Sequence, residues 1–169
     1  KGKDFDEFKG DVWVDTLFYS EKGNDFHTTN FEGSIERSPR IDKLKLFSDW
    51  IDADVMGQLD FDKIAKNVLV QLENIFPAFI PGDHEPVVDS SYFDYNIDIK
   101  DVNPILNVVY PSLQVAENTN LNGRYVGKKG EMSLNAESDY VSYDSTRIEG
   151  ISIIQDIYYD ELLALYRAN

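Results

Sequence analysis

Aspartates spaced two residues apart, together with two histidines, are the residues of this chain that could support chemistry. Paired carboxylates can act in glycoside hydrolysis or can bind calcium. Such aspartates occur at Asp4 and Asp6, Asp52 and Asp54, Asp60 and Asp62, and from Asp94 to Asp98. His27 and His84 are far apart, and neither has a neighbour at the spacing of a metal site. The aspartate pairs are therefore the first candidates for a catalytic or metal site.

The residues around these aspartates favour a solvated surface instead. Residues two apart in a strand lie on the same face, and apolar residues alternate with Asp52, Asp54 and Asp60. Acidic residues are expected on the face of such a strand that meets water. The chain has no cysteine, nucleophile elbow, phosphate-binding glycine loop or EF-hand loop. We therefore expect no catalytic residue, no metal ligand and no cofactor, and a protein that is not an enzyme.

The composition is that of an acidic protein that folds. Of its 169 residues, 42% are hydrophobic and 13% aromatic, which is enough apolar surface to offset the entropy of ordering the chain. The net charge of −15 repels the phosphates of nucleic acids, and no basic stripe counters it. No stretch is apolar for the length of a membrane-spanning helix. We expect no nucleic-acid partner and no transmembrane segment in this chain.

Apolar and polar residues alternate along most of the chain, which is typical of strands with one dry face and one wet face. The clearest case runs from Ile51 to Phe61. The same pattern predicts strands at 12–19, 27–36, 93–99 and 132–137. In the strand at 12–19, the residues expected on one face are Val12, Val14, Thr16 and Phe18. In the strand at 27–36, they are His27, Thr29, Phe31, Gly33 and Ile35.

Two segments have helical spacing instead. A helix is predicted at 62–76, with Asp60 or Asp62 as its N-cap and prolines after its end. A shorter one is predicted at 103–110, with Asn103 as its cap and prolines in its first turn and after its end. We expect one continuous domain in three parts: strand repeats at 1–61, a helical insertion at 62–111 with a loop at 81–91 and a strand at 92–100, and strand repeats at 112–169.

A short motif recurs along the predicted strands: an apolar residue, any residue, a glycine, any residue, and usually another apolar residue. Its glycines are Gly10, Gly33, Gly57, Gly123 and Gly150. They recur about every 24 to 27 residues on either side of the helical insertion, a period typical of stacked units. We expect the motif at strand starts. Its glycine should lie on the apolar face, where the missing side chain permits a bend or a close approach.

Several passages resemble one family. The stretch 48–57 contains Asp-Ala-Asp-Val-x-Gly and leads into a helix entry at 60–64. The strand at 93–101 reads Phe-x-Tyr-x-Ile-x-Ile-Lys-Asp, and the stretch 116–123 ends in Leu-x-Gly. In these degenerate patterns, which cover nearly the whole chain, the sequence is similar to the TamB branch of the AsmA-like bacterial envelope proteins, in the versions of Bacteroides-type bacteria.

The resemblance implies a mainly β protein with two short helices. Its sheet would be curved and rich in antiparallel strands, an open groove or half-barrel, with the helices on or capping the apolar face. The chain would be periplasmic, and its parent protein would be anchored in the inner membrane. Phospholipid acyl chains would be its ligands, and outer-membrane assembly proteins would bind regions that this chain lacks. Because the chain begins at Lys1 and stops inside a patterned stretch, we expect it to be part of a longer protein.

The predicted groove or core residues are apolar residues of the strands: Val12, Val14, Phe18, Phe31, Ile35, Ile51, Val55, Leu59, Phe93, Tyr95, Ile97, Leu121 and Tyr125. A closed sheet remains an alternative to an open groove. A second hypothesis is a β-rich envelope module that binds a glycan or a protein partner through outward aromatic residues, namely Trp13, Trp50, Tyr92 and Tyr140. A hydrolase that uses an aspartate pair is the third and weakest hypothesis.

Overall fold

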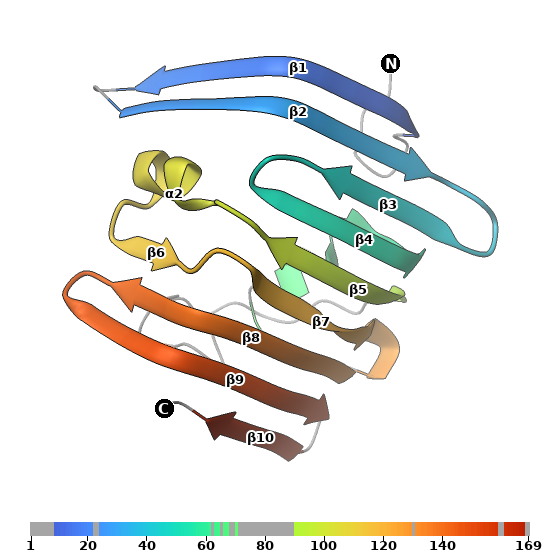
Figure 1. Ribbon diagram of the computed structural model, residues 1–169. Coiled ribbons are helices and arrows are strands. Elements are labelled where there is room, and N and C mark those ends of the chain that lie inside the picture. The colour runs from blue at the N-terminus through green and yellow to red at the C-terminus, as the bar shows by residue number, and fades with distance from the viewer. Residues whose placement is uncertain are drawn as a thin grey trace.

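The computed structural model describes residues 9–21, 24–61, 63–64, 66–67, 70, 90–129, 131–158 and 161–167. They form a single sheet of ten strands with little helix (Figure 1). The strands are β1 (Gly10–Glu21), β2 (Asn24–Glu36), β3 (Asp42–Phe47), β4 (Ile51–Gln58), β5 (Tyr92–Ile99), β6 (Leu113–Val115), β7 (Thr119–Val126), β8 (Glu131–Tyr143), β9 (Thr146–Tyr158) and β10 (Glu161–Arg167). The helical segments are α2 (Asn103–Val109), the 3-10 helix η2 (Gly127–Lys129) and helical residues between 61 and 70.

Every pairing between these strands is antiparallel, in the order β1-β2-β3-β4-β5-β7-β8-β9-β10, with β6 beside β8. Within the described residues, β1 and β10 are the two edges, so the sheet does not close (Figure 1). The predicted mainly β fold with an antiparallel sheet is confirmed. The predicted strand at 92–100 is β5, which pairs with β4 on one side and β7 on the other. The sheet therefore runs across both boundaries of the predicted helical insertion.

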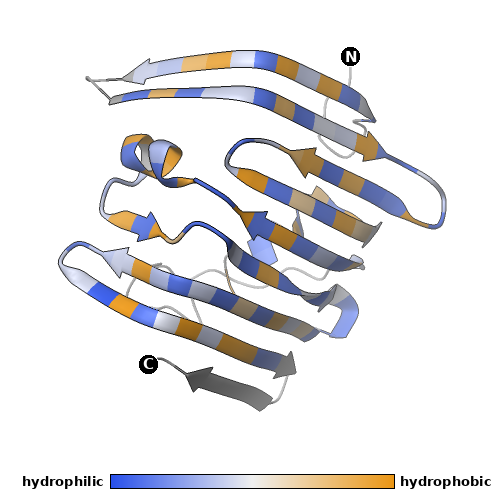
Figure 2. Cartoon of the chain, viewed as in Figure 1, coloured by the Kyte–Doolittle hydropathy of each residue, from blue (hydrophilic) through white to orange (hydrophobic). Residues whose placement is uncertain are grey.

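The strand register gives the sheet two faces of opposite character. One row across six strands is apolar: Leu46, Ala53, Ile97, Leu121, Ala136 and Ile153. The neighbouring row on the other side is mainly polar: Lys45, Asp54, Asn96, Asn122 and Asn135. We call these sides the apolar face and the polar face. Figure 2 shows the alternation along the strands that produces them.

The alternation changes phase in β2 at Asn30, whose φ of 68° lies in the left-handed region. Asparagine tolerates this region better than most residues. Before it, buried Thr28 accepts a hydrogen bond from the Trp50 indole (3.1 Å), and after it Phe31 stacks on the same indole at 6.0 Å. Thr28 and Phe31 thus share the apolar face. The expectation that His27 shares a face with Phe31 is wrong.

Strand β1 follows β2 through this change, because the two strands keep one register. Val14 pairs with Phe31, whereas Phe18 pairs with His27 and stacks on its ring at 5.8 Å. Cross-strand partners share a face. Phe18 therefore lies on the polar face, where it is 77% exposed, and only Val12 and Val14 of the predicted set face the apolar side.

Helical residues follow β4 and begin at Asp60, one of the two predicted N-caps. Its carboxylate accepts a hydrogen bond from the backbone N–H of Lys63 (3.2 Å), and its carbonyl accepts one from Ile64 (2.9 Å). Phe61 and Ile64 pack against the apolar face. Most of the predicted helix at 62–76, and residues 81–89 of the predicted loop at 81–91, lie outside the described residues.

Helix α2 connects β5 to β6 and contacts both β2 and β6 (Figure 1). Its N-cap is Val102, and Pro104 lies in its first turn as predicted. The prediction that Asn103 caps the helix is wrong. Its amide instead donates to the carbonyl of Val115 (2.9 Å) and accepts from the backbone N–H of the same residue (3.0 Å). These two bonds tie α2 to β6.

The repeat glycines do not mark strand starts as expected, with the exception of Gly10, the first residue of β1. Gly33 and Gly57 lie near the ends of β2 and β4, and Gly123 and Gly150 lie inside β7 and β9. The register places Gly33, Gly57 and Gly123 on the apolar face, where the motif predicted its glycines. The repeat therefore marks positions on a face and not a repeated strand unit.

Candidate functional site

The apolar face collects most of the predicted groove or core residues. Leu59, Phe93 and Tyr125 are buried. The other members of the set on this face are half-buried, namely Val14, Phe31, Ile35, Ile51, Val55, Tyr95, Ile97 and Leu121. Val12, on the edge strand, is 39% exposed. The face therefore has a packed region and a region that keeps partial contact with its surroundings.

The packed region lies where helical residues cover β4, β5 and β7. The rings of Phe93 and Tyr125 lie 5.1 Å apart, and Ile64 packs against them together with Leu59. The amide of Asn67 donates to the Tyr125 hydroxyl (3.0 Å), so the polar end of this tyrosine is satisfied inside the core. Leu59, Phe93 and Tyr125 are core residues, and half-buried Ile97 and Leu121 are the better candidates for contact with a ligand.

Two repeat glycines let neighbouring strands approach closely on the apolar face. A Cβ atom at Gly57 would overlap the carbonyl oxygen of Tyr92, and one at Gly123 would overlap that of Ser133. The hydroxyl of Tyr95 lies over Gly123 and donates to the Ser133 carbonyl (2.9 Å). Burial raises the pKa of Tyr95 to about 12, so the hydroxyl stays protonated, as a donor, well into the alkaline range. The close approach predicted at the glycines is confirmed at these two positions.

The aromatic residues predicted as a glycan-binding platform do not form one surface. Trp50 is half-buried between Phe26 and Phe31, with its indole N–H bonded to Thr28. Its predicted outward position is wrong. Tyr140 lies under the guanidinium of Arg147, 3.7 Å from ring centroid to Cζ. Trp13 and Tyr92 are exposed, at 67% and 45%, but lie in β1 and β5, which are not neighbours.

Asparagine side chains form a hydrogen-bonded line across the polar face. Asn135 donates to Asn122 (3.2 Å), Asn122 to Asn120 (2.7 Å), and Asn120 to the Asp98 carboxylate (2.6 Å). These groups satisfy one another across β8, β7 and β5. The line therefore ties these three strands together on the polar face.

The aspartates that could have formed a catalytic or metal site have structural partners. Asp52 binds Lys100 (2.7 Å), and Asp94 binds Arg124 (2.6 Å). Asp60 caps a helix. Among the described residues, no three histidine, cysteine or acidic side chains cluster as metal ligands would. Asp4, Asp6, Asp62 and His84 lie outside the described residues.

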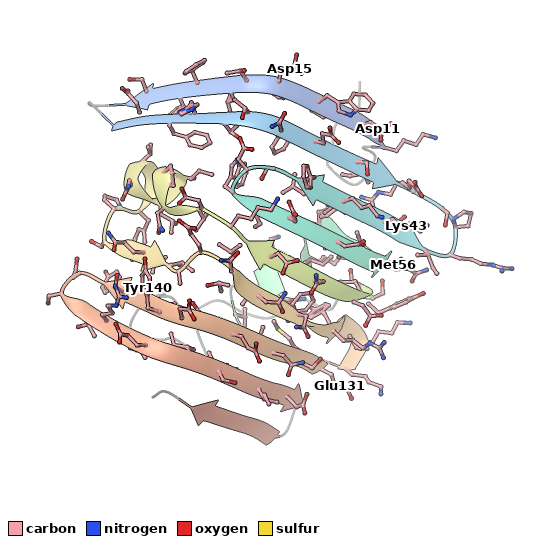
Figure 3. All side chains as sticks on the ribbon, viewed as in Figure 1. Asp11, Asp15, Lys43, Met56, Glu131 and Tyr140 are labelled. Carbon is pink, nitrogen blue, oxygen red and sulfur yellow. The ribbon has the colours of Figure 1, made fainter. Side chains whose placement is uncertain are left out.

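A hollow that the sequence analysis missed lies at one end of the sheet, close to Met56 and Glu131 and opposite to the end with Tyr140 (Figure 3). Its volume is about 550 Å³, within the usual range of ligand pockets. Its lining includes Gln58, Tyr92, Asp94, Arg124, Val126 and Lys128. These residues come from β4, β5, β7 and η2.

A signal for this hollow is present in the sequence but depends on topology. Arg124 and Lys128 are far from Tyr92 along the chain, and no basic stripe marks them. In an antiparallel sheet, the end of β4, the start of β5 and the end of β7 meet at one end. Knowledge of which strands pair was therefore needed to bring these side chains together.

No helix in the described part of the chain is long and apolar enough to cross a membrane. Comparisons with family models, with curated proteins and with solved structures found no match to this chain.

Proposed function

We propose that this chain is a non-enzymatic segment of a large TamB/AsmA-like periplasmic protein, and that its apolar face forms part of a hydrophobic groove for phospholipid on its way to the outer membrane. The parent protein would be anchored in the inner membrane and would meet outer-membrane assembly proteins through other regions. Two features support this proposal: the open antiparallel sheet and the separation of its two faces.

The observation that carries the proposal is the continuous apolar row from Leu46 to Ile153. The row crosses β3, β4, β5, β7, β8 and β9. Five inter-strand spacings of about 4.8 Å make it about 24 Å long. One leaflet of a bilayer contributes about 15 Å to a hydrocarbon core of about 30 Å. The row is therefore long enough to lie along a phospholipid acyl chain.

The energetics of such contact follow from apolar burial. Transfer of apolar surface out of water stabilises a complex by about 25 cal/mol per Å². Ile97 and Leu121 pair across β5 and β7 and are only half-buried, so part of their surface is left for a ligand. The polar face, with its asparagine line and ion pairs, prefers water. An acyl chain would therefore bind on one side of the sheet only.

Photo-crosslinking of the full chain tests this proposal. A benzophenone amino acid at Ile97 or Leu121 should capture lipid from vesicles of phosphatidylethanolamine and phosphatidylglycerol, as detected by mass spectrometry. Asn96 and Asn122 are matched controls, because they lie one residue away on the polar face of the same two strands. Equal capture at all four positions, or none at Ile97 and Leu121, would overturn the proposed groove.

A further inference from the structure

Several basic side chains lie at one end of this acidic sheet, which we call the basic end. The connections at this end carry Arg37, Arg40, Lys128 and Lys129, and the adjoining strand ends carry Lys43 and Arg124. The chain as a whole has a net charge of −15. Arg37, Lys43, Arg124 and Lys129 pair there with Asp42, Glu36, Asp94 and Glu131, so an anion site at this end depends on the cationic groups that can still bind a ligand.

Two cationic groups in the hollow at this end, those of Arg124 and Lys128, can still bind an anionic ligand. Arg124 binds Asp94 through Nε (2.6 Å) and Nη2 (3.1 Å), and its Nη1 has no partner within the described part of the chain. Among the same residues, Lys128 forms no ion pair, whereas its neighbour Lys129 pairs with Glu131 (3.4 Å). Asp94 fixes the plane of the guanidinium, which leaves one edge of it for a ligand.

The rest of the hollow combines apolar surface with polar groups. Tyr92 and Val126 pair across β5 and β7 and contribute apolar side chains. Phe93 and Tyr125, the neighbouring residues of the same two strands, also line it, but successive side chains of a strand point to opposite faces, and these two lie in the core of the apolar face. Tyr92, Asp94, Arg124 and Val126 share the register of Asn96 and Asn122, so the hollow lies on the polar face, at its end, and carries cations at its rim. This combination suits a ligand with an anionic group attached to an apolar body.

We infer that this hollow binds a phosphate-bearing group, with Lys128 and the free edge of Arg124 as its cationic contacts. Guanidinium and ammonium groups are the usual partners of phosphate in proteins. The group is either the phosphodiester of a phospholipid headgroup or free phosphate, and the lipid source rests on the proposed function. A headgroup bound here would lie on the polar side of the sheet, and its acyl chains would have to pass round the end of the sheet to reach the apolar face.

Calorimetric titration of the full chain with two probes tests the inference, using inorganic phosphate and dihexanoyl phosphatidylglycerol. Lys128→Gln should weaken binding roughly tenfold, as expected for loss of a charge-assisted contact. Lys129→Gln removes the same charge from the adjacent residue and should change binding less than about twofold. Lys128 is exposed, so its substitution leaves the core intact, which thermal unfolding verifies.

The two probes also identify the source of the phosphate. Tighter binding of the lipid than of inorganic phosphate supports a headgroup site, and equal binding supports a site for free phosphate. Equal losses in Lys128→Gln and Lys129→Gln, or no binding of either probe, would overturn the inference. Lipid capture at Ile97 with unchanged binding in Lys128→Gln would remove the phosphate site and leave the proposed groove standing.

Discussion

Gly57 and Gly123 occupy positions where the neighbouring strand leaves no room for a side chain. A methyl group at either position would overlap a backbone carbonyl, that of Tyr92 or that of Ser133. Backbone cannot move aside as a flexible side chain can, so the strands would have to separate. We predict that Gly57→Ala and Gly123→Ala each lower the free energy of unfolding by about 1–3 kcal/mol in urea titrations.

Gly33 is the matched control for these substitutions, because it also lies on the apolar face. Its added Cβ would lie 3.7 Å from Phe31 and 3.9 Å from Leu46, which are ordinary contacts. Gly33→Ala should leave the free energy of unfolding unchanged or raise it by up to about 1 kcal/mol, since alanine has less freedom in the unfolded chain. Similar losses for all three variants would show that the overlaps do not matter.

Asp49 holds β2 next to the left-handed Asn30. One carboxylate oxygen accepts from the backbone N–H of Thr29 (2.7 Å), from the Thr29 hydroxyl (2.9 Å) and from the Thr28 hydroxyl (3.3 Å). These bonds, the backbone one first, hold the pKa of Asp49 below its ordinary value. A carboxylate of this kind stabilises the fold above its unfolded pKa, and that stability is lost as the pH falls through its folded pKa.

The prediction for Asp49→Asn follows from the lowered pKa of the Asp49 carboxyl group. The wild type should be more stable than the variant at pH 6, and the difference should shrink as the pH falls below about 4. Chemical unfolding at a series of pH values measures it. Asp11→Asn serves as the control, because among the described residues Asp11 accepts no side-chain hydrogen bond. A constant difference between wild type and Asp49→Asn at all pH values would contradict the role assigned to the carboxylate.

At the scale of elements, the Asn103 side chain links α2 to β6. The Asn103 amide satisfies both backbone groups of Val115, as a neighbouring strand would. Asn103→Ala should lower the free energy of unfolding by about 1–3 kcal/mol, the sum expected for two hydrogen bonds. The Val115 amide should also lose protection in hydrogen exchange. Glu117→Ala, an exposed change in the same region, should alter neither measurement.

The sequence predicted elements well where local patterns determine them. The alternation predicted at 51–61 became β4, which ends earlier, at Gln58. The pattern at 93–99 became β5, and Asp60 caps a helix as its position suggested. Two features escaped prediction because they depend on tertiary contacts. The phase change at Asn30 requires the contacts of Trp50 and Asp49, and Asn103 prefers the backbone of Val115 to a capping role.

At the scale of the whole molecule, the arrangement of the strands decides what could be predicted of the candidate sites. Period-two alternation in each strand was enough to expect an apolar face, because every strand contributes to it independently. The hollow at the basic end is different, since Tyr92, Arg124 and Lys128 meet only when β5 pairs with β7. A topology in which β5 paired elsewhere would have the same local patterns and no such site.

Net charge determines how the whole sheet responds to salt. A charge of −15 destabilises the compact state by self-repulsion, whereas surface ion pairs such as Arg124–Asp94 contribute only about 0–1 kcal/mol each. We predict that Tm rises by a few degrees between 10 and 150 mM NaCl, as the Debye length falls from about 30 to about 8 Å. Asp98 faces Asp52 across β5 and β4. Asp98→Asn should therefore raise Tm at 10 mM NaCl and reduce the gain from salt, while its side-chain oxygen still accepts from Asn120. A Tm that falls with salt would mean that the ion pairs outweigh the repulsion.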